Sequence, residues 1–357
     1  MTTSISPKLV STLNLARALA ATYVVAHHLA NHHGWSSQGL GIFFRFGQEA
    51  VLVFFLLSGF VIFSNERDRV FPPHRYYLRR IRRLYPTLVA AMVVSTAVAA
   101  DNGTLAREFH VSELVGTLLG LQDISDLKPG VIVDPYLGND PLWSLSYEAA
   151  FYFVFPFVMW LWKRSSNRVE HGIGIASCAA YVIYVSAPNH WALVSSYFLV
   201  WWCGATIADR YHRGERSYRS LGPPLYWLVA LCSIAGISAV WIGFRSLGTY
   251  PVLPFRHFAV GLLLVVTIFS GLGARLAKLL VPIAVFASSL ASISYGLYVL
   301  HYPILVTWQR AQTPGGFAIA TFILVASAYL SDAKMLQLFS RARKPVPTQI
   351  HPSRSPT

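Results

Sequence analysis

Ten apolar runs, most of them close to the length that crosses a bilayer, constrain the fold of this 357-residue chain more than any other feature. A transmembrane helix needs about 20 mostly apolar residues, so the shorter runs require tilt or flanking aromatic residues. Only 12% of the residues are charged, whereas soluble domains carry about 25%. We therefore predict an all-α, polytopic integral membrane protein with about ten transmembrane helices. The runs are 9–30, 50–64, 84–100, 149–161, 172–187, 191–207, 225–244, 257–272, 279–302 and 316–329.

The distribution of basic residues gives an independent check on this count. With the N-terminus in the cytoplasm, 22 of the 29 Lys and Arg residues fall in cytoplasmic segments, as the positive-inside rule requires. One missed or extra helix would reverse every later segment and remove the asymmetry. We predict both termini in the cytoplasm and a multi-pass location in the cell (inner or plasma) membrane. Topology accounts for the net charge of +14, so no nucleic-acid partner is expected.

Two segments differ from the apolar runs. Residues 101–148 form a long outer loop with eight of the fifteen acidic residues, and its Pro and Gly residues favour short helices and turns. Residues 336–357 form a basic, Pro- and Ser-rich cytoplasmic tail that is predicted to be disordered. The membrane domain is expected to cover residues 1–335. Cys178, Cys203 and Cys232 lie in apolar segments without a paired spacing and are interpreted as packing residues.

The first apolar run contains polar residues that need an explanation. An Arg near the bilayer centre costs at least about 2.5–3.5 kcal/mol, yet Arg17 lies in the middle of this run. Eleven helical steps place His28 only about 20° away from Arg17 around the helix and about 16 Å along it, whereas His27 lies about 80° away. One hypothesis is a structural Arg with an interfacial His. The other is a lined cavity in which His28 acts as a base or an acyl acceptor.

A metal site at the same place is a further alternative. His28 and His32 are four residues apart, a spacing that suits a shared metal ion. No acid or Cys joins them at a defined spacing, so no metal is predicted.

A basic cluster precedes the third run. The stretch RYYLRRIRRLYP (75–86) places Arg79, Arg80 and Arg83 on one helical face at the cytoplasmic interface. Lipid headgroups and topology alone would explain this face. The alternative is binding of a cytosolic, phosphate-rich donor, which suits bidentate Arg side chains.

Three further motifs carry polar residues at the outer side. In GQEAVLVFFLLSGFVIF (47–63), Glu49 shares the level of His28 and either orients it or lies at the interface, while Ser58 and Gly59 favour close helix packing. In PLWSLSYEAAFYFVFP (141–156), an aromatic belt explains the aromatic residues, but not an acid that enters the membrane. In SISYGLYVLHYP (292–303), the simpler interpretation is that His301 is a hydrogen-bonded residue at the membrane interface. The acid that enters the membrane in the stretch 141–156 is Glu148, a candidate catalytic residue. The candidate acceptor-site or supporting residues are Glu49, Trp143, Ser144, Tyr295 and His301.

In this order, the stretches LARALAATYVVAHH, GQEAVLVFFLLSGFVI, RRIRRLYP, PLWSLSYEAAFYFVFP and ISYGLYVLHYP resemble acyltransferase family 3, whose members acylate surface and secreted glycans in bacteria. They extend from residue 13 to about residue 303. The resemblance implies an O-acyltransferase that moves an acyl group, often acetyl, from cytosolic acyl-CoA to a hydroxyl of a saccharide or glycolipid at the outer face. Acyl-CoA is then a co-substrate, and no bound cofactor is expected.

The resemblance also implies roles for individual residues. Arg17 and His28 match the family's Arg–His pair, Arg80 and Arg83 match its RxxR motif on the donor side, and Glu148 matches the acid of its WSLSxE-type motif. Arg17 is expected to anchor the donor or stabilise developing charge, and Glu148 to orient His28 or hold the sugar. Direct transfer and an acyl-His intermediate both stay open.

The chain departs from the family in the motif that resembles GVDLFF, where Leu52 replaces the acid. A different class also fits an intramembrane Arg and His, namely a transporter or flippase for a glycolipid or small molecule. Transporters often show two related halves, and the sequence shows no such symmetry. Turnover of acyl-CoA distinguishes the two functions.

Overall fold

The computed structural model describes residues 6–334 except 38, 216, 245, 270, 271, 274, 276–278 and 280–283. The described residues form helices and turns, with one isolated β-bridge between Gln122 and Val133 and no strand. The predicted disordered tail lies outside them. The long helices are α1 (Pro7–His32), α2 (Gly47–Glu66), α3 (Pro73–Asp101), α6 (Trp143–Trp162), α7 (Ser166–Ser186), α8 (His190–His212), α10 (Pro223–Ile242), α11 (Val252–Phe269) and α15 (Pro314–Ala328).

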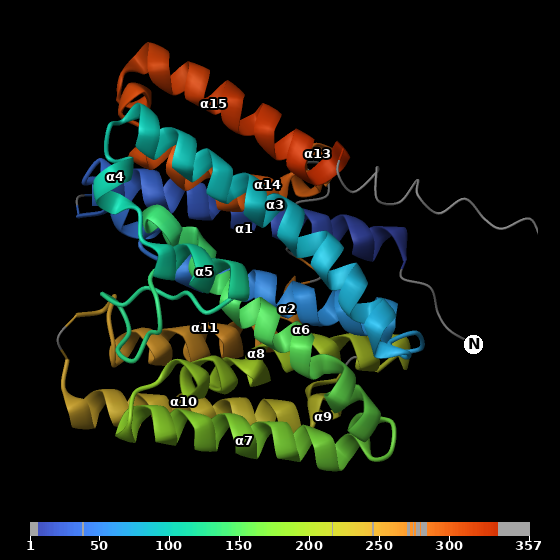
Figure 1. Ribbon diagram of the computed structural model, residues 1–357. Helices are drawn as coiled ribbons and strands as arrows, with labels where there is room; N and C mark the ends of the chain where they lie inside the picture. Colours follow the sequence, from blue (N-terminus) through green and yellow to red (C-terminus); the bar gives the residue numbers. More distant parts are fainter. Residues whose placement is uncertain are drawn as a thin grey trace, which may run out of the picture.

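Eight of the described helical segments are long and apolar enough to span a membrane, and α11 is a shorter apolar helix beside them. This confirms a polytopic, all-α membrane protein. In Figure 1 the long helices run across the molecule side by side, with α7 and α10 at one flank and α15 at the other. Helix α8 packs against both α2 and α7, and α1 packs against α2. Most of α8 is therefore buried by other helices.

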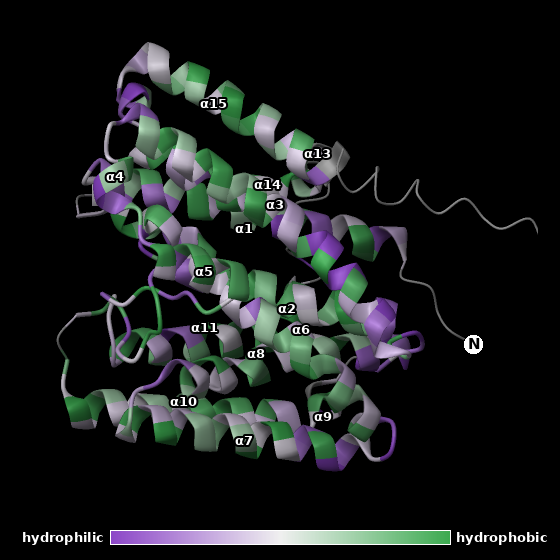
Figure 2. Cartoon of the chain, in the orientation of Figure 1, coloured by the Kyte–Doolittle hydropathy of each residue, from purple (hydrophilic) through white to green (hydrophobic). Residues whose placement is uncertain are grey.

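The two ends of the bundle differ in charge. Helix α1 begins and η8 (Tyr329–Lys334) ends at the same end of the bundle (Figure 1), as an even number of spans requires. The arginine-rich turn between α2 and α3 lies at this end, which we call the basic end. Figure 2 shows hydrophilic residues gathered near the helix ends and hydrophobic residues along the helices. The loop that joins α3 to α6 lies at the opposite end, called the loop end.

Helices α2 and α8 approach each other at two glycines. A Cβ on Gly59 would lie 2.1 Å from the carbonyl oxygen of Trp201, and one on Gly204 would lie 2.1 Å from that of Leu56. Any larger side chain would force the two backbones apart. The Ser58 hydroxyl contacts the Trp201 indole Nε1 at 3.2 Å. The prediction that Ser58 and Gly59 serve close helix packing is thus confirmed.

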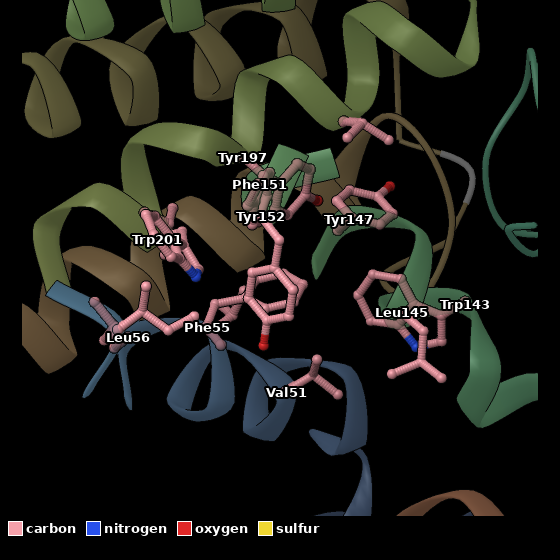
Figure 3. Close-up of a cluster of buried hydrophobic side chains, with 14 of the residues drawn as sticks. Val51, Phe55, Leu56, Trp143, Leu145, Tyr147, Phe151, Tyr152, Tyr197 and Trp201 are labelled. Carbon is pink, nitrogen blue, oxygen red and sulfur yellow. The ribbon is translucent and has the colours of Figure 1, made fainter. Parts of the chain in front are cut away.

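Aromatic side chains fill the space between α2, α6 and α8 (Figure 3). The ring of Phe55 lies 5.6 Å from that of Phe151 in an edge-to-face arrangement, and Phe151 lies 6.0 Å from Trp201. Such pairs contribute about 0.5–1.5 kcal/mol each beyond their buried area. Two of the cysteines, Cys178 and Cys203, are buried nearby as packing residues, and no disulfide joins them.

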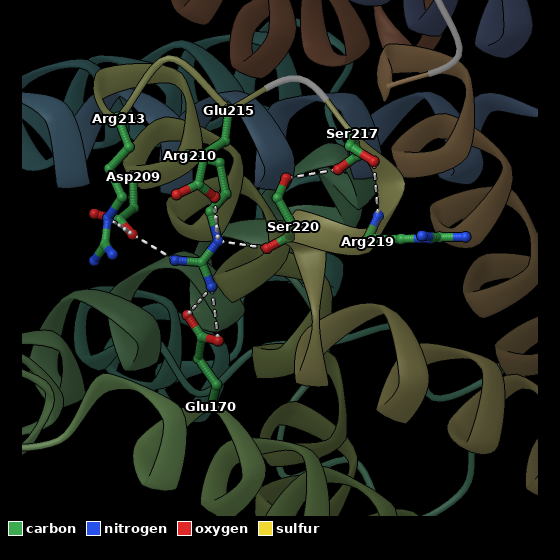
Figure 4. A network of polar contacts seen from close by, with 8 residues as sticks. All are labelled: Glu170, Asp209, Arg210, Arg213, Glu215, Ser217, Arg219 and Ser220. Atoms are coloured by element: carbon green, nitrogen blue, oxygen red, sulfur yellow. Dashed lines mark hydrogen bonds and ion pairs between the residues drawn. The ribbon is translucent and has the colours of Figure 1, made fainter.

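A buried ion-pair network fixes the basic end of α7, α8 and α9 (Tyr218–Leu221) (Figure 4). Arg210 donates to both carboxylate oxygens of Glu170 at 3.1 Å and to Asp209 at 2.6 Å. Its Nε donates to the carbonyl of Ser220 at 2.6 Å. Because every buried charge in this group has a partner, the network joins three helices without an isolated charge.

Several helices begin earlier than the apolar runs that predicted them. Helix α6 begins at Trp143 rather than near residue 149, and α3 begins at Pro73 rather than near residue 84. Apolarity marks where the chain enters lipid, whereas the helix continues into polar residues whose backbone still needs hydrogen bonds. As a result Glu148 lies inside a helix, on the same face as Ser144 and Tyr152.

The ninth predicted span, 279–302, is the clearest difference from the sequence prediction. Part of it, 280–283, lies outside the described residues. The part from 284 onward forms α13 (Ala284–Ser292) and α14 (Ser294–His301), and a π-helical turn, η6 (Tyr302–Thr307), begins where the predicted span ends. The break at Ile293 lies between Ser292 and Ser294, whose hydroxyls donate to backbone carbonyls three residues earlier. Pro303 lacks an N–H, which favours the wider turn that follows.

The loop end is built from short elements, as predicted. They are α4 (Leu105–Glu108), α5 (Val111–Leu119), η3 (Tyr136–Gly138) and η4 (Asp140–Leu142). The Gln122 side chain donates to the Leu142 carbonyl at 2.7 Å, and Asn139 donates to the Val299 carbonyl at 3.0 Å. These buried hydrogen bonds hold the loop against α6 and α14.

Candidate functional site

A cavity of about 380 Å³ opens at the loop end between α1, α2, α6 and α14. Residues of the acidic loop, including Ile124 and Leu127, form part of its wall. Its polar and aromatic lining consists of His27, His28, Asn31, His32, Gln48, Asp140, Trp143, Tyr298 and Tyr302. We call it the imidazole cavity.

His28 lies in the imidazole cavity with three rings around it. Ring centroids lie 4.9 Å away for His27, 5.3 Å for His301 and 5.0 Å for Tyr302. Within the described part of the chain, neither ring nitrogen of His28 makes a hydrogen bond. Both nitrogens are thus available to a ligand or a neighbouring side chain.

His27 differs from His28 although it lines the same cavity. Its Nδ1 donates to the carbonyl of Phe44, and its Nε2 accepts from Asn31 at 3.1 Å. A Cβ on Gly47 would overlap the His27 ring, so the ring also packs against the start of α2. His27 therefore secures the turn between α1 and α2.

The spacing of His28 and His32 does not produce a metal site among the described residues. His32 instead contacts the Gln312 side chain at 2.9 Å. No three His, Cys, Asp or Glu residues converge in the described ranges in a way that would hold a metal ion.

Arg17 lies on the same face of α1, about 16 Å from His28 along the axis. It is half-buried and makes no ion pair with a described residue. Its electrostatic neighbours are Arg83, Glu148, Tyr152 and Asp332. The separation exceeds the reach of an arginine side chain, so the Arg17 guanidinium does not contact the His28 ring.

Glu148 lies with Arg17 rather than with His28. It accepts a hydrogen bond from the Tyr152 hydroxyl at 2.5 Å, one helical turn further along α6. One turn earlier, the Ser144 hydroxyl contacts the Tyr298 hydroxyl at 2.9 Å, and Tyr298 lines the imidazole cavity. The polar face of α6 thus extends from Glu148, an electrostatic neighbour of Arg17, toward the cavity.

The arginines of the basic cluster form ion pairs with carboxylates that the sequence analysis did not identify. Arg79 binds both carboxylate oxygens of Glu66, its Nε at 2.9 Å from Oε1, and Arg80 binds Oε1 of the same residue at 3.2 Å. Glu66 is fully buried. The predicted phosphate-binding face therefore has two members already paired, with a fork geometry that fixes the α2–α3 turn.

Arg83 makes a weaker ion pair within the protein than Arg79 and Arg80 do. Its Nη1 lies 3.5 Å from Asp332, and its guanidinium lies 5.3 Å from the centroid of the Tyr295 ring. Asp332 already accepts from the backbone N–H of Gly296 at 2.8 Å. Arg83 is thus the member of the cluster with the most capacity for another anion. Tyr295 lies here at the basic end, not in the imidazole cavity, and donates to the Leu84 carbonyl.

Glu49 does not orient His28. Its carboxylate pairs with Arg256 of α11 at 2.5 Å and is almost fully buried. No described contact joins it to the imidazole cavity. This acid holds α2 to α11.

Trp143 forms one wall of the imidazole cavity and rests on a buried cation. The Lys128 ammonium lies 4.0 Å from the Trp143 ring centroid and 2.5 Å from Asp123. Asp123 also accepts from the Tyr147 hydroxyl at 2.7 Å. Burial lowers the pKa of Lys128, and the adjacent carboxylate opposes this effect. No sequence pattern indicated this network, because its members are brought together only by the loop fold.

Replacing Lys128 with Met should destabilise the protein by roughly 3–5 kcal/mol, because a buried Asp123 loses its ionic partner. Thermal unfolding of the detergent-purified protein measures this loss. The double variant Lys128→Met, Asp123→Asn is expected to recover part of it, since no unpaired charge remains. Equal stability of the single variant and the wild type would show that the pair makes no net contribution.

The fold and its interior define a class of protein, namely a polytopic membrane protein with a histidine-lined cavity at one end and an arginine cluster at the other. Residues 10–333 match the family described as an acyltransferase domain, acyltransferase family 3. The chain belongs to this family, which makes it a membrane acyltransferase.

Among curated relatives, Nodulation protein 10 of Rhizobium leguminosarum bv. viciae is 24% identical over 82% of each chain. Acyltransferase MdmB of Streptomyces mycarofaciens is 32% identical over 48% of this chain and 45% of its own. Peptidoglycan O-acetyltransferase OatA of Listeria monocytogenes is 26% identical over 53% of this chain and 31% of its own. No solved structure matches the chain.

Proposed function

We propose that this acyltransferase moves an acyl group, acetyl in the simplest case, from cytosolic acyl-CoA to a hydroxyl of a saccharide or glycolipid at the outer face. The observation that carries the proposal is that the two ring nitrogens of His28, in a cavity at the loop end, have no hydrogen-bond partner among the described residues. The acceptor class is supported by the name of OatA, a peptidoglycan O-acetyltransferase. The basic end would face the cytoplasm of the cell membrane, following the positive-inside rule.

The donor would enter from the basic end. Its phosphates would bind Arg83. Arg79 and Arg80 share the single carboxylate of Glu66, so this group keeps a net positive charge that would attract the phosphates. Arg17 and the polar face of α6 lie between this end and His28, and would contact the donor on its way to the cavity. We assign Arg17 to anchoring the donor, because its distance from His28 keeps it from the reacting carbonyl.

The chemical step would take place in the imidazole cavity. His28 removes the proton of the acceptor hydroxyl, and the oxygen attacks the thioester carbonyl carbon. The carbon–sulfur bond then breaks, the acyl group stays on the acceptor oxygen, and the CoA thiolate takes the proton from His28. If His28 instead carries the acyl group, radiolabel should appear on the protein when acceptor is withheld.

The proposal is tested with labelled acetyl-CoA and inside-out membrane vesicles that contain the protein. Base-labile label should appear in the glycan and lipid fraction, and sealed right-side-out vesicles should give none because the donor cannot reach the basic end. Wild-type vesicles that never consume acyl-CoA, with the native envelope acceptors present, would contradict it. Movement of a glycolipid without donor turnover would instead establish a transporter.

Arg83→Gln should raise KM for acyl-CoA by roughly 10-fold or more while kcat changes little, because one charge-assisted contact to phosphate is lost. Initial rates over a range of donor concentrations separate the two parameters. Arg82→Gln is the matched control, since Arg82 is an exposed neighbour on another face of α3. Equal KM values in both variants would remove Arg83 from the donor site.

A further inference from the structure

His301 of α14 is a buried aromatic neighbour of His28 on another helix. The side chain is fully buried, and its ring centroid lies 5.3 Å from that of His28. The two planes are tilted by 43°. An ionisable ring in this position needs a reason, because burial of a polar group without a hydrogen bond costs free energy.

The hydrogen bond that His301 makes determines which of its nitrogens carries the proton. Its Nδ1 lies 3.0 Å from the carbonyl oxygen of Leu297. A carbonyl oxygen only accepts, so Nδ1 must be the N–H donor. In the neutral ring Nε2 then carries the lone pair and acts as an acceptor. This buried Nε2 has no partner among the described residues.

Among the rings around His301, His28 is the candidate donor to that lone pair that has no other hydrogen-bond partner among the described residues. The Tyr298 hydroxyl contacts the Ser144 hydroxyl at 2.9 Å, and the Tyr302 hydroxyl donates to Asp140 at 3.3 Å. The two nitrogens of His27 contact Phe44 and Asn31. Of the three tyrosine and histidine neighbours and His28, only His28 has ring nitrogens without a hydrogen-bond partner in the described part of the chain.

We propose that His301 is a positioning residue for His28, whose ring donates one N–H to Nε2 of His301. The other nitrogen of His28 then keeps its lone pair toward the imidazole cavity, where the acceptor hydroxyl binds. Catalytic hydrogen bonds are often long before substrate binds and shorten in the complex. The role in turnover rests on the proposed function, whereas the tautomer of His28 can be measured without it.

Two substitutions at His301 separate positioning from space filling. His301→Leu removes the acceptor, whereas the Gln side-chain oxygen of His301→Gln can still accept from His28. We expect His301→Leu to lower kcat by about 10- to 100-fold with KM for acyl-CoA nearly unchanged, because His28 loses its preferred tautomer. His301→Gln should keep at least about five times more activity than His301→Leu.

A second measurement does not depend on acyl transfer. Diethyl pyrocarbonate modifies the lone-pair nitrogen of a neutral imidazole, and mass spectrometry of the purified protein gives the rate at His28. This rate should fall several-fold in His301→Leu and return toward the wild-type value in His301→Gln. The matched control is His190→Leu, which removes another buried His whose Nδ1 has no hydrogen-bond partner among the described residues, and which should leave labelling of His28 unchanged.

Leu and Gln variants with the same kcat and the same labelling rate would overturn the proposal, whether both resemble the wild type or both are impaired. If the wild type transfers no acyl group, the proposed function fails while the labelling order still decides the role of His301. Protein yield and melting temperature in detergent identify a variant that has lost its fold, and the labelling comparison of wild type with His301→Gln then decides alone.

Discussion

His28→Ala is expected to reduce acyl transfer by at least about 100-fold, the usual contribution of a positioned general base. His28 lies in the imidazole cavity, and unlike His27 its ring nitrogens have no hydrogen-bond partner among the described residues. The measurement is the initial rate of base-labile label transfer from acetyl-CoA, at matched amounts of protein in the membrane. A larger loss would indicate that His28 also carries the acyl group.

His27→Ala is the natural control because the two residues are adjacent and line the same cavity. Both nitrogens of His27 already contact Phe44 and Asn31, so its removal should cost stability at the α1–α2 turn rather than chemistry. Per molecule of folded protein, activity should stay within about threefold of the wild type, since no general base is lost. If His27→Ala lost activity while His28→Ala kept it, the assignment of the general base to His28 would be wrong.

Arg17→Met should lower kcat/KM for acyl-CoA by about 100-fold. Arg17 is half-buried in the middle of α1 without an ionic partner among the described residues. A cation in that position is costly unless a ligand uses it, and charge-assisted hydrogen bonds to the donor would offset the cost. Steady-state rates at varied donor concentration measure the effect, which should fall mainly on KM.

Arg17→Lys tests whether charge alone suffices. Lys keeps the positive charge but loses the planar fork, so we expect an intermediate loss, roughly 10-fold. Protection of the protein by CoA against thermal unfolding should weaken in the same order. If Arg17→Met kept the wild-type KM and CoA protection while only its melting temperature fell, Arg17 would be a structural residue.

Much of the architecture could be predicted from the sequence because a bilayer leaves few alternatives. A segment such as 191–207 must become a helix to satisfy its backbone in lipid, and α8 covers it. The exceptions have local causes. Helix α6 extends to Trp143 because a helix does not end at the lipid boundary, and the segment near Ile293 breaks where serine hydroxyls compete for carbonyls.

The site divides in the same way. Helical periodicity within one element predicted that Arg17 and His28 share a face, and it preferred His28 to His27. Ion partners from other helices were out of its reach. Glu66 binds Arg79, and Arg256 binds Glu49, and neither pair has a spacing that a sequence pattern reports.

The sequence by itself determined the helical membrane class, the placement of both chain ends on one side and the face of α1 that carries the polar residues. These depend on the composition and periodicity of single segments, which are local properties. Only the tertiary structure decided that Glu148 lies near Arg17, that Asp332 pairs with Arg83 and that His301 lies beside His28. Such contacts join helices far apart in the chain, and they follow from side-chain packing between helices rather than from the order of residues within one.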